Sequence, residues 1–261
     1  MHSANTEVAS ATYDAGYFEV LARVEDRHFW FQARNRLIHA LAAQLIQVAA
    51  APRRVLEVGC GNGNVLRWLR SACSESCVIG LDLFPEGLSL AKARTGASVV
   101  SADIFRLPFR ESFNLVGIFD VLEHLDEDGA ALAAVGSVMP AGGQLMITVP
   151  ASESLWSYFD VAAHHRRRYD TAQLRRTIEK SGFQVDFLSP FMATIYPLVY
   201  AGRKLASWHG NSAKQSAEYD LKIVPGVNEA LAFVLRQEMR FLTARRVLPF
   251  GTSLLALAHK K

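Results

Sequence analysis

Paired cysteines are missing from this sequence. Its 261 residues include only three cysteines, Cys60, Cys73 and Cys77, and no C-x-x-C element. An odd, unpaired set of this kind argues against both a disulfide framework and a structural zinc site. Reduced thiols are usual in the cytoplasm, so the sequence favours a cytoplasmic protein.

Long hydrophobic runs are also missing. The most apolar late stretch, residues 191–208, is interrupted by Pro197, Gly202, Arg203 and Lys204. It falls short of the roughly 20 apolar residues that a membrane-spanning helix needs. The start of the chain has no basic segment followed by an apolar one, so we expect no secretory signal. A peripheral membrane contact stays open.

Neither sign of charge is in excess. The 28 Lys and Arg residues and 25 Asp and Glu residues leave a formal net charge of +3, which argues against a nucleic-acid-binding protein. The chain is 50% hydrophobic and 20% charged, the balance of a globular protein. Without repeats or low-complexity tracts, a chain of this length can bury one substantial core. We therefore expect a single domain over residues 1–261.

Apolar segments of strand length alternate with helical patterns through the first 150 residues. A helix is expected at 28–50, and residues 53–72 have the pattern of strand, tight turn and helix. Further strands are expected at 77–84, 97–103, 113–120 and 142–150, with helices beginning at Pro85 and covering about 126–139. This rhythm favours a parallel sheet with helices on both faces.

Beyond Pro150 the pattern changes. We expect helices near 151–159 and at 171–182, a sixth strand at 183–190 and a last strand at 252–260. The apolar stretch between these two strands, residues 191–250, predicts one or two helices. An insertion of this length more often covers a site than merely connects two strands.

The stretch "LEVGCGNGN" places Gly59, Gly61 and Gly63 where the first strand turns into its helix. Glycine lets the backbone turn sharply and approach a ligand closely, and the helix amino terminus behind it favours polar or anionic groups. The spacing differs from the dinucleotide fingerprint G-x-G-x-x-G, whose third glycine would replace Asn64. Glu57 is also unusual for a dehydrogenase strand, although it could be a buried ion-pair partner. A nicotinamide-dependent oxidoreductase is therefore disfavoured.

From about residue 25 to 190 the sequence resembles the class I S-adenosylmethionine-dependent methyltransferases, whose first motif is E-x-G-x-G-x-G. Asp82 stands where the family's acid binds the ribose hydroxyls, and two charge-assisted hydrogen bonds suit a vicinal diol. Asp103 and Ile104 match the positions beside the adenine. Each acid has a plainer alternative, since Asp82 could be a turn residue and Asp103 a helix cap. "FNLVGIFDVLEHLDED" resembles the family's fourth motif, although Asn114 stands where many members have Asp.

Two further elements resemble a subset of small-molecule methyltransferases that includes those of ubiquinone biosynthesis. They are "HFWF..R" upstream and the pattern H-x-R-R-Y downstream. The upstream element implies a helical lid whose aromatic faces close over the sulfonium, with Arg34 facing the cofactor carboxylate. A helix that buries these aromatics in the core is the alternative. Together the resemblances imply a cofactor site of Glu57, Gly59, Cys60, Gly61, Gly63, Asp82, Leu83, Asp103, Ile104, Phe119, Trp30 and Arg34.

The acceptor side is expected around His124, His165 and the remaining residues of the H-x-R-R-Y pattern. A histidine near neutral pKa is the usual base for a hydroxyl acceptor, so His124 and His165 are the catalytic candidates. His124 could instead only shape the pocket, and an arginine of the motif could pair with Glu153 or Asp160. Substrate-binding residues are expected to be Arg167, Arg168, Tyr169 and Tyr196.

No metal site is expected. Asp120, Glu123 and Asp126 follow one another along a strand–helix junction, and acids spaced in this way do not converge on one point.

The resemblance implies an α/β fold with a Rossmann-like, doubly wound, mostly parallel seven-stranded sheet whose last strand is antiparallel. An N-terminal helical cap (1–50), a cofactor-binding core (53–150) and a substrate-side half (151–261), which includes the insertion at 191–250, would form the single domain. The function implied is methyl transfer from S-adenosyl-L-methionine to a small apolar or amphipathic acceptor, with S-adenosyl-L-homocysteine as product. O-methylation is expected, and N- or C-methylation and a catalytically silent cofactor-binding module are the alternatives. A homodimer stays open.

Overall fold

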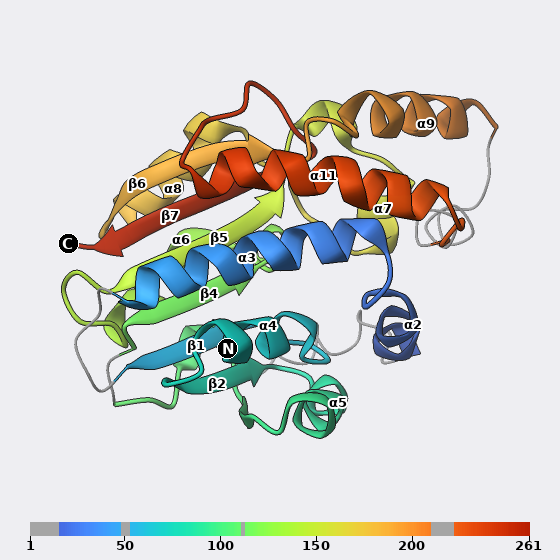
Figure 1. Ribbon diagram of the computed structural model, residues 1–261. Helices are drawn as coiled ribbons and strands as arrows, with labels where there is room; N and C mark the ends of the chain where they lie inside the picture. The colour runs from blue at the N-terminus through green and yellow to red at the C-terminus, as the bar shows by residue number, and fades with distance from the viewer. Residues whose placement is uncertain (1–15, 48–52, 111–112, 210–221) are drawn as a thin grey trace.

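The computed structural model describes residues 16–47, 53–110, 113–209 and 222–261. Seven strands form one sheet in the order β3-β2-β1-β4-β5-β7-β6 (Figure 1). Pairing is parallel from β3 to β5, and β7 is antiparallel to both β5 and β6. The strands are β1 (Arg54–Val58), β2 (Cys77–Asp82), β3 (Ser98–Ser101), β4 (Leu115–Phe119), β5 (Gln144–Pro150), β6 (Phe183–Phe191) and β7 (Ser253–Lys260). The expected Rossmann-like fold with one antiparallel strand is confirmed.

Helices cover both faces of the sheet, because strand residues alternate between two cores. Leu255 and Leu257 of β7 belong to one core, whereas Leu254 and Ala256 belong to the other. The first core is covered by α3 (Phe29–Gln47), α4 (Asn64–Ala72), α5 (Pro85–Thr95) and α11 (Val227–Thr243), and the second by α6 (Asp128–Ser137) and α8 (Thr171–Lys180). In Figure 1, α3 and α11 cross the front of the sheet.

Short elements surround the carboxyl ends of the parallel strands, where α/β proteins bind ligands. They are α2 (Gly16–Val24), η1 (Ile104–Arg106), η2 (Leu122–His124), η3 (Glu153–Leu155), α7 (Tyr158–Ala162) and α9 (Tyr196–His209). The single helix expected near 151–159 is therefore two short ones. Trp156 ends the first in an extended conformation, and Ser157 begins the second as an N-cap whose capping box is completed by Asp160.

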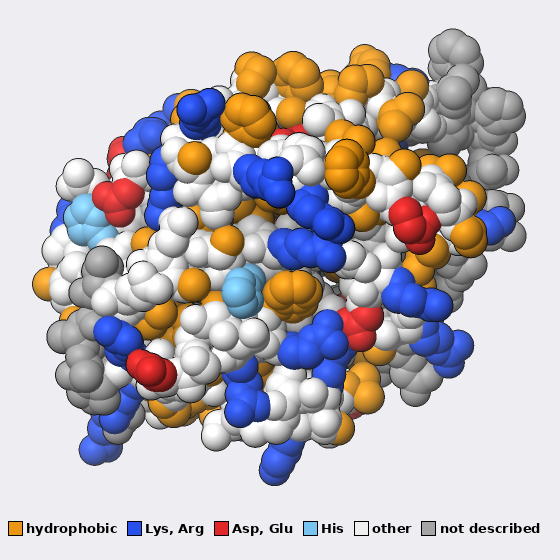
Figure 2. All heavy atoms as spheres, in the orientation of Figure 1, with side chains coloured by type: hydrophobic (Ala, Val, Ile, Leu, Met, Phe, Trp, Pro, Cys, Tyr) orange, Lys and Arg blue, Asp and Glu red, His pale blue; other side chains and the backbone are white. Residues whose placement is uncertain are grey.

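Two expected regions extend past the described residues. The helical cap is described only as α2 and α3, because residues 1–15 and 48–52 lie outside the described part. Within the described residues the insertion contains helices α9 and α11, and residues 210–221 between them lie outside the described part. No helix in the described ranges is both long and apolar enough to span a membrane. Apolar and basic side chains are interspersed on the face shown in Figure 2.

Candidate active site

A cavity of about 1520 Å³ opens at the carboxyl ends of β1, β2 and β4. Its walls come from segments far apart in the sequence: α2 and the start of α3, the glycine loop after β1, η1, η2, the η3–α7 segment and α9. The size is ample for a nucleoside-containing ligand together with a second small molecule.

The glycine loop forms the floor because larger residues do not fit there. Gly59, Gly61 and Gly63 all have positive φ, at 75°, 49° and 80°. A Cβ on Gly59 would lie 2.3 Å from Cγ2 of Val121, and one on Gly63 would lie 2.9 Å from Cα of Ala91. Gly59 and Gly61 line the cavity, whereas Gly63 packs the loop against α5.

Asp82 ends β2 and faces the cavity with 7% of its surface exposed. Its carboxylate accepts hydrogen bonds from the N–H of Gly61 (2.7 Å) and of Phe84 (3.0 Å). Burial raises the pKa of Asp82, while these backbone donors oppose the shift. The N–H bonds fix the carboxylate and leave lone pairs for the two hydroxyls of a ribose.

Glu57 is the buried acid of β1, with 2% of its surface exposed. Burial raises the pKa of Glu57 well above 4.5; the charge of Arg34 opposes the shift, and that of Asp82 adds to it. Its Oε2 atom has no hydrogen-bond partner among the described residues, yet the side chain lines the cavity. A buried acid without a partner suits a ligand cation, and the α-ammonium group of S-adenosylmethionine is one. The site therefore fits the expected cofactor.

The adenine-side residues lie in the same wall. Asp103 accepts a hydrogen bond from the N–H of Phe105 at 3.0 Å and so caps η1. This is the helix-cap role that was the alternative to adenine binding. Asp103 also lines the cavity beside Ile104, which is buried. Three further expected residues, Cys60, Leu83 and Phe119, line the cavity as well.

Arg34 is not free to receive a ligand carboxylate with its whole guanidinium group. It forms an ion pair with Asp120, which directly follows β4 and has a φ of 55°. Its guanidinium carbon lies 4.8 Å from the ring centre of Trp30 and 5.5 Å from that of Phe31. The lid aromatics Trp30 and Phe31 therefore flank a protein cation and also line the cavity, and their cover of the sulfonium stays a prediction.

Charged residues at the joint between α2 and α3 fasten this lid to the core. Arg94 of α5 forms ion pairs with both Glu25 and Asp26, and Arg67 binds Asp26 at 2.8 Å. Phe18 of α2 is buried above Gly61. These contacts were not predicted from the sequence, although the acids stand immediately before "RHFWF".

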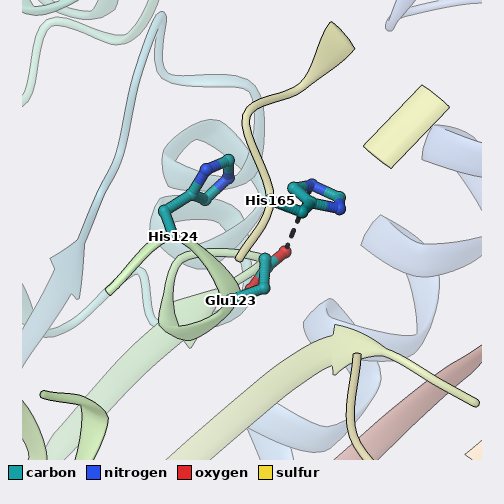
Figure 3. Close-up of side chains that lie close together, drawn as sticks. All are labelled: Glu123, His124 and His165. Carbon is teal, nitrogen blue, oxygen red and sulfur yellow. Dashed lines mark ion pairs between the residues drawn. The ribbon is translucent and has the colours of Figure 1, made fainter. Parts of the chain in front are cut away.

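Three side chains converge on the acceptor side of the cavity: Glu123 and His124 from η2, and His165 from the segment before α8 (Figure 3). One potential ligand atom from each lies within 4.8 Å of the others. Glu123 points toward His165, and its Oε1 atom is 4.0 Å from Nε2 of that ring. The centres of the two imidazole rings are 4.9 Å apart.

The ionisation of this cluster is set by burial. Burial lowers the pKa of His124 to about 3, and the neighbouring His165 adds to the shift. Burial also raises the pKa of Glu123 well above 4.5, with a further contribution from Asp120. His124 is therefore a neutral imidazole and a weak base near pH 7.

His165 is oriented by Asp160, whose Oδ1 atom lies 2.8 Å from Nδ1 of the ring. Asp160 is fully buried and also accepts a 2.8 Å hydrogen bond from Nε of Arg168. Burial acts to raise the pKa of Asp160, but the His165 hydrogen bond and the Arg168 charge outweigh it, so the net shift is downward. Arg168 is therefore the arginine of the H-x-R-R-Y pattern that pairs with Asp160, as the alternative reading of that pattern expected. Arg168 also lines the cavity.

Three expected substrate residues lie outside the cavity lining. Tyr169 is fully buried, and its hydroxyl donates to Oδ2 of Asp128 at 2.8 Å. Arg167 also faces Asp128, at 3.4 Å. Tyr196 stacks on Tyr200 instead, with ring centres 6.1 Å apart. These positions do not fit direct contact with an acceptor in the cavity.

The three acids considered in the sequence have different partners, and one of them lies near two histidines. Asp126 is exposed and pairs with Arg166 at 3.2 Å. Glu123 instead faces His165, which is 42 positions away in the sequence. The approach of His165 to Glu123 depends on how distant segments pack, so the order of the acids along the chain does not indicate it.

Comparison with known proteins agrees with this geometry. Residues 27–187, more than half of the chain, match the family described as "Methyltransferase domain". A ubiquinone biosynthesis O-methyltransferase of Xanthomonas axonopodis pv. citri is 24% identical over 213 residues, which cover 72% of this chain and 88% of that protein.

Solved structures show the same fold at lower identity. A chain in the complex of the Haloferax volcanii Trm112 methyltransferase activator with a methyltransferase has a TM-score of 0.58 and 19% identity, covering 94% of each chain. Phosphoethanolamine N-methyltransferase 2 of Haemonchus contortus, solved with S-adenosyl-L-methionine, has a TM-score of 0.55 and 17% identity, covering 87% of this chain and 52% of that one. With the glycine loop, Asp82 and Glu57 in place, the chain belongs to the methyltransferase domain family and is a class I S-adenosylmethionine-dependent methyltransferase.

Proposed function

We propose that the chain methylates a hydroxyl group of a small apolar or amphipathic acceptor. The observation that carries this proposal is the position of His124 and His165 in the cavity that also contains the glycine loop. His165, oriented by Asp160, would receive a hydrogen bond from the acceptor hydroxyl and help to remove its proton, whereas the weakly basic His124 would only accept a hydrogen bond.

The apolar character of the acceptor follows from the wall beyond the histidines. Trp156, Val161 and Leu198 line the cavity and are exposed at 39%, 56% and 63%. Ile195 and Val199 of the α9 region continue this wall inward. The similar protein from Xanthomonas is named for ubiquinone biosynthesis, and an acceptor with an apolar tail would fit such a surface.

The proposed roles of the residues are to bind, align and exclude water. Asp82 would hold the ribose hydroxyls, and Glu57 the ammonium group. S-adenosyl-L-methionine supplies a methyl group already activated by its positively charged sulfur. Alignment of an acceptor oxygen with that methyl group can lower the barrier by roughly 7–11 kcal/mol. Trp30 and Phe31 lie at the cavity wall and would limit the entry of water.

Calorimetry and an acceptor screen test this proposal. The purified chain should bind S-adenosyl-L-methionine with one site, and Asp82→Asn should weaken binding at least tenfold. Incubation with metabolite extracts and cofactor that carries an isotopically labelled methyl group should give a product, identified by mass spectrometry, whose labelled methyl is bound to an oxygen. A labelled methyl bound to nitrogen or carbon in that product would reject O-methylation. Cofactor binding without any labelled product would favour a silent binding module.

A further inference from the structure

We propose that two buried amides, Asn35 and Asn64, position the guanidinium group of Arg34 so that it binds the carboxylate in the methionine part of S-adenosyl-L-methionine. Both asparagines lie outside the cavity lining and act through Arg34, so they are positioning residues. The inference deepens the cofactor site of the proposed function and does not depend on which acceptor atom is methylated.

A row of hydrogen bonds, here called the amide relay, connects the lid joint to Arg34. Asp26, at the joint between α2 and α3, accepts a hydrogen bond from Nδ2 of Asn64 at 3.2 Å. Oδ1 of Asn64 accepts one from Nδ2 of Asn35, and Oδ1 of Asn35 accepts one from Nε of Arg34 at 3.2 Å. The amide relay therefore links the joint, the first residue of α4 and two neighbouring residues of α3.

The two ends of the amide relay fix its direction. A guanidinium group only donates hydrogen bonds, and an ionised carboxylate only accepts them. Burial acts to raise the pKa of Asp26, but the hydrogen bond and charge of Arg94 outweigh it, so the net shift is downward and Asp26 is ionised near pH 7. Each residue between the two ends must therefore accept on one side and donate on the other. An amide does both, whereas a carboxylate cannot donate.

Burial makes the amide relay rigid. Asn35 is fully buried, and Asn64 is 4% exposed. A buried amide that loses a partner cannot replace it with water and bears the cost of its lost hydration. Each amide therefore keeps its orientation, and the carbonyl oxygen of Asn35 stays directed at Nε of Arg34.

The contacts of Arg34 leave one of its nitrogens for a ligand. Asn35 accepts from Nε, and Asp120 pairs with Nη1. Two contacts on a planar group fix its plane as well as its position, whereas the Asp120 contact alone would let the group turn. Nη2 has no hydrogen-bond partner among the described residues, and the side chain lines the cavity.

The nearby acid Glu57 indicates what Arg34 would bind. Burial raises the pKa of Glu57, and the charge of Arg34 opposes the shift, so the two groups are close enough to interact at the cavity wall. The methionine part of the cofactor carries an ammonium and a carboxylate on the same carbon. With the ammonium assigned to Glu57, a carboxylate beside it suits a charge-assisted hydrogen bond from Arg34.

Two ligands that differ in the methionine part test the amide relay. S-adenosyl-L-homocysteine has this part, whereas 5′-methylthioadenosine keeps the adenosine and the uncharged sulfur but has only a methyl group in its place. In calorimetry of the full chain, Asn35→Leu should raise the Kd for S-adenosyl-L-homocysteine at least tenfold and change that for 5′-methylthioadenosine less than twofold. Asn35→Asp keeps an acceptor for Arg34 but cannot donate to Asn64, and its added negative charge should give the same selective loss.

Asn228→Leu is the matched control. Asn228 is 7% exposed, and its amide bonds the backbone of Arg27 at 3.0 Å and of Phe29 at 2.9 Å. The substitution removes two buried hydrogen bonds at the same lid joint but none of the amide relay. The ratio of the two Kd values should therefore stay that of wild type. Circular dichroism would establish that each variant is folded.

The proposal is overturned if both substitutions of Asn35 weaken the two ligands by the same factor, as a general loss of lid structure would, or if they change neither affinity. It is also overturned if Asn228→Leu shows the same selective loss, because the joint rather than the amide relay would then set the affinity. Failure of O-methylation in the acceptor screen does not alter these ratios. A wild-type chain that binds neither S-adenosyl-L-methionine nor S-adenosyl-L-homocysteine would reject the proposed function itself.

Discussion

Backbone conformation at single residues determines how closely a ligand can approach the floor of the cavity. Gly59 and Gly142 have almost the same positive φ, at 75° and 77°. They differ in their surroundings, since a Cβ on Gly59 would collide with Val121, whereas one on Gly142 would meet nothing within 4 Å. The two positions therefore separate backbone strain from steric collision.

We predict that Gly59→Ala impairs cofactor binding and that Gly142→Ala does not. Both substitutions place a side chain in the left-handed region, at a cost of about 1–2 kcal/mol in unfolding free energy. Only Gly59→Ala also displaces Val121 and the floor of the cavity, so its Kd for S-adenosyl-L-methionine should rise at least tenfold. Calorimetry and urea denaturation of both variants measure the two effects. Equal cofactor affinity in the two variants would contradict this account of the loop.

Much of the cofactor side was predictable from single residues. Gly59, Gly61, Asp82 and Glu57 lie at or next to the carboxyl ends of strands. In a parallel sheet these ends lie along the same edge, so residues there are expected to be close together. The acceptor side was less predictable, because contacts such as that between His165 and Glu123 depend on how distant segments pack. The sequence pattern also predicted that Tyr169 contacts the substrate, whereas its buried hydroxyl donates a hydrogen bond to Asp128.

At the scale of elements, the lid is held by charge rather than by apolar packing alone. Arg94 of α5 bridges Glu25 and Asp26 at the joint between α2 and α3, and Glu25 is 4% exposed. Periodicity predicted the helix at α3 but carried no information about this joint. Ion pairs between distant helices leave no regular spacing in a sequence.

Arg94→Gln should therefore loosen the lid and destabilise the protein by about 3 kcal/mol, because it leaves Glu25 buried without its cation. Hydrogen exchange should increase in α2 and at the start of α3 and stay unchanged in β5. The control is Arg175→Gln, which removes an exposed pair with Glu179 within α8 and should cost no more than about 0.5 kcal/mol. Similar losses in the two variants would show that the joint is not held by this ion pair.

At the scale of the whole molecule, the buried acids make stability depend on pH. Burial raises the pKa of Glu57 well above its ordinary value of 4.5, so the folded protein holds this proton more tightly than the unfolded chain does. The stabilisation is complete below about pH 4.5 and is lost as the pH rises through the folded-state pKa.

We predict that the unfolding free energy of wild type falls relative to that of Glu57→Gln as the pH is raised from 5 to 9. The glutamine has no proton to lose, so its curve lacks this contribution. Urea denaturation at a series of pH values measures the difference between the two proteins. Two parallel curves would mean that Glu57 is ionised throughout, with a counter-ion that the described residues do not reveal.

The arrangement of β6 and β7 also bears on how the chain is made. Among the described strands, β6 lies at the edge of the sheet and pairs with β7 alone, yet roughly sixty residues, 192–252, separate the two strands in the sequence. During synthesis on a ribosome, β6 would emerge well before β7. Its backbone donors and acceptors would be open to other chains during that interval. Closure of the sheet is therefore a late step, and slow translation between α9 and β7 would lengthen the period in which the nascent chain can aggregate.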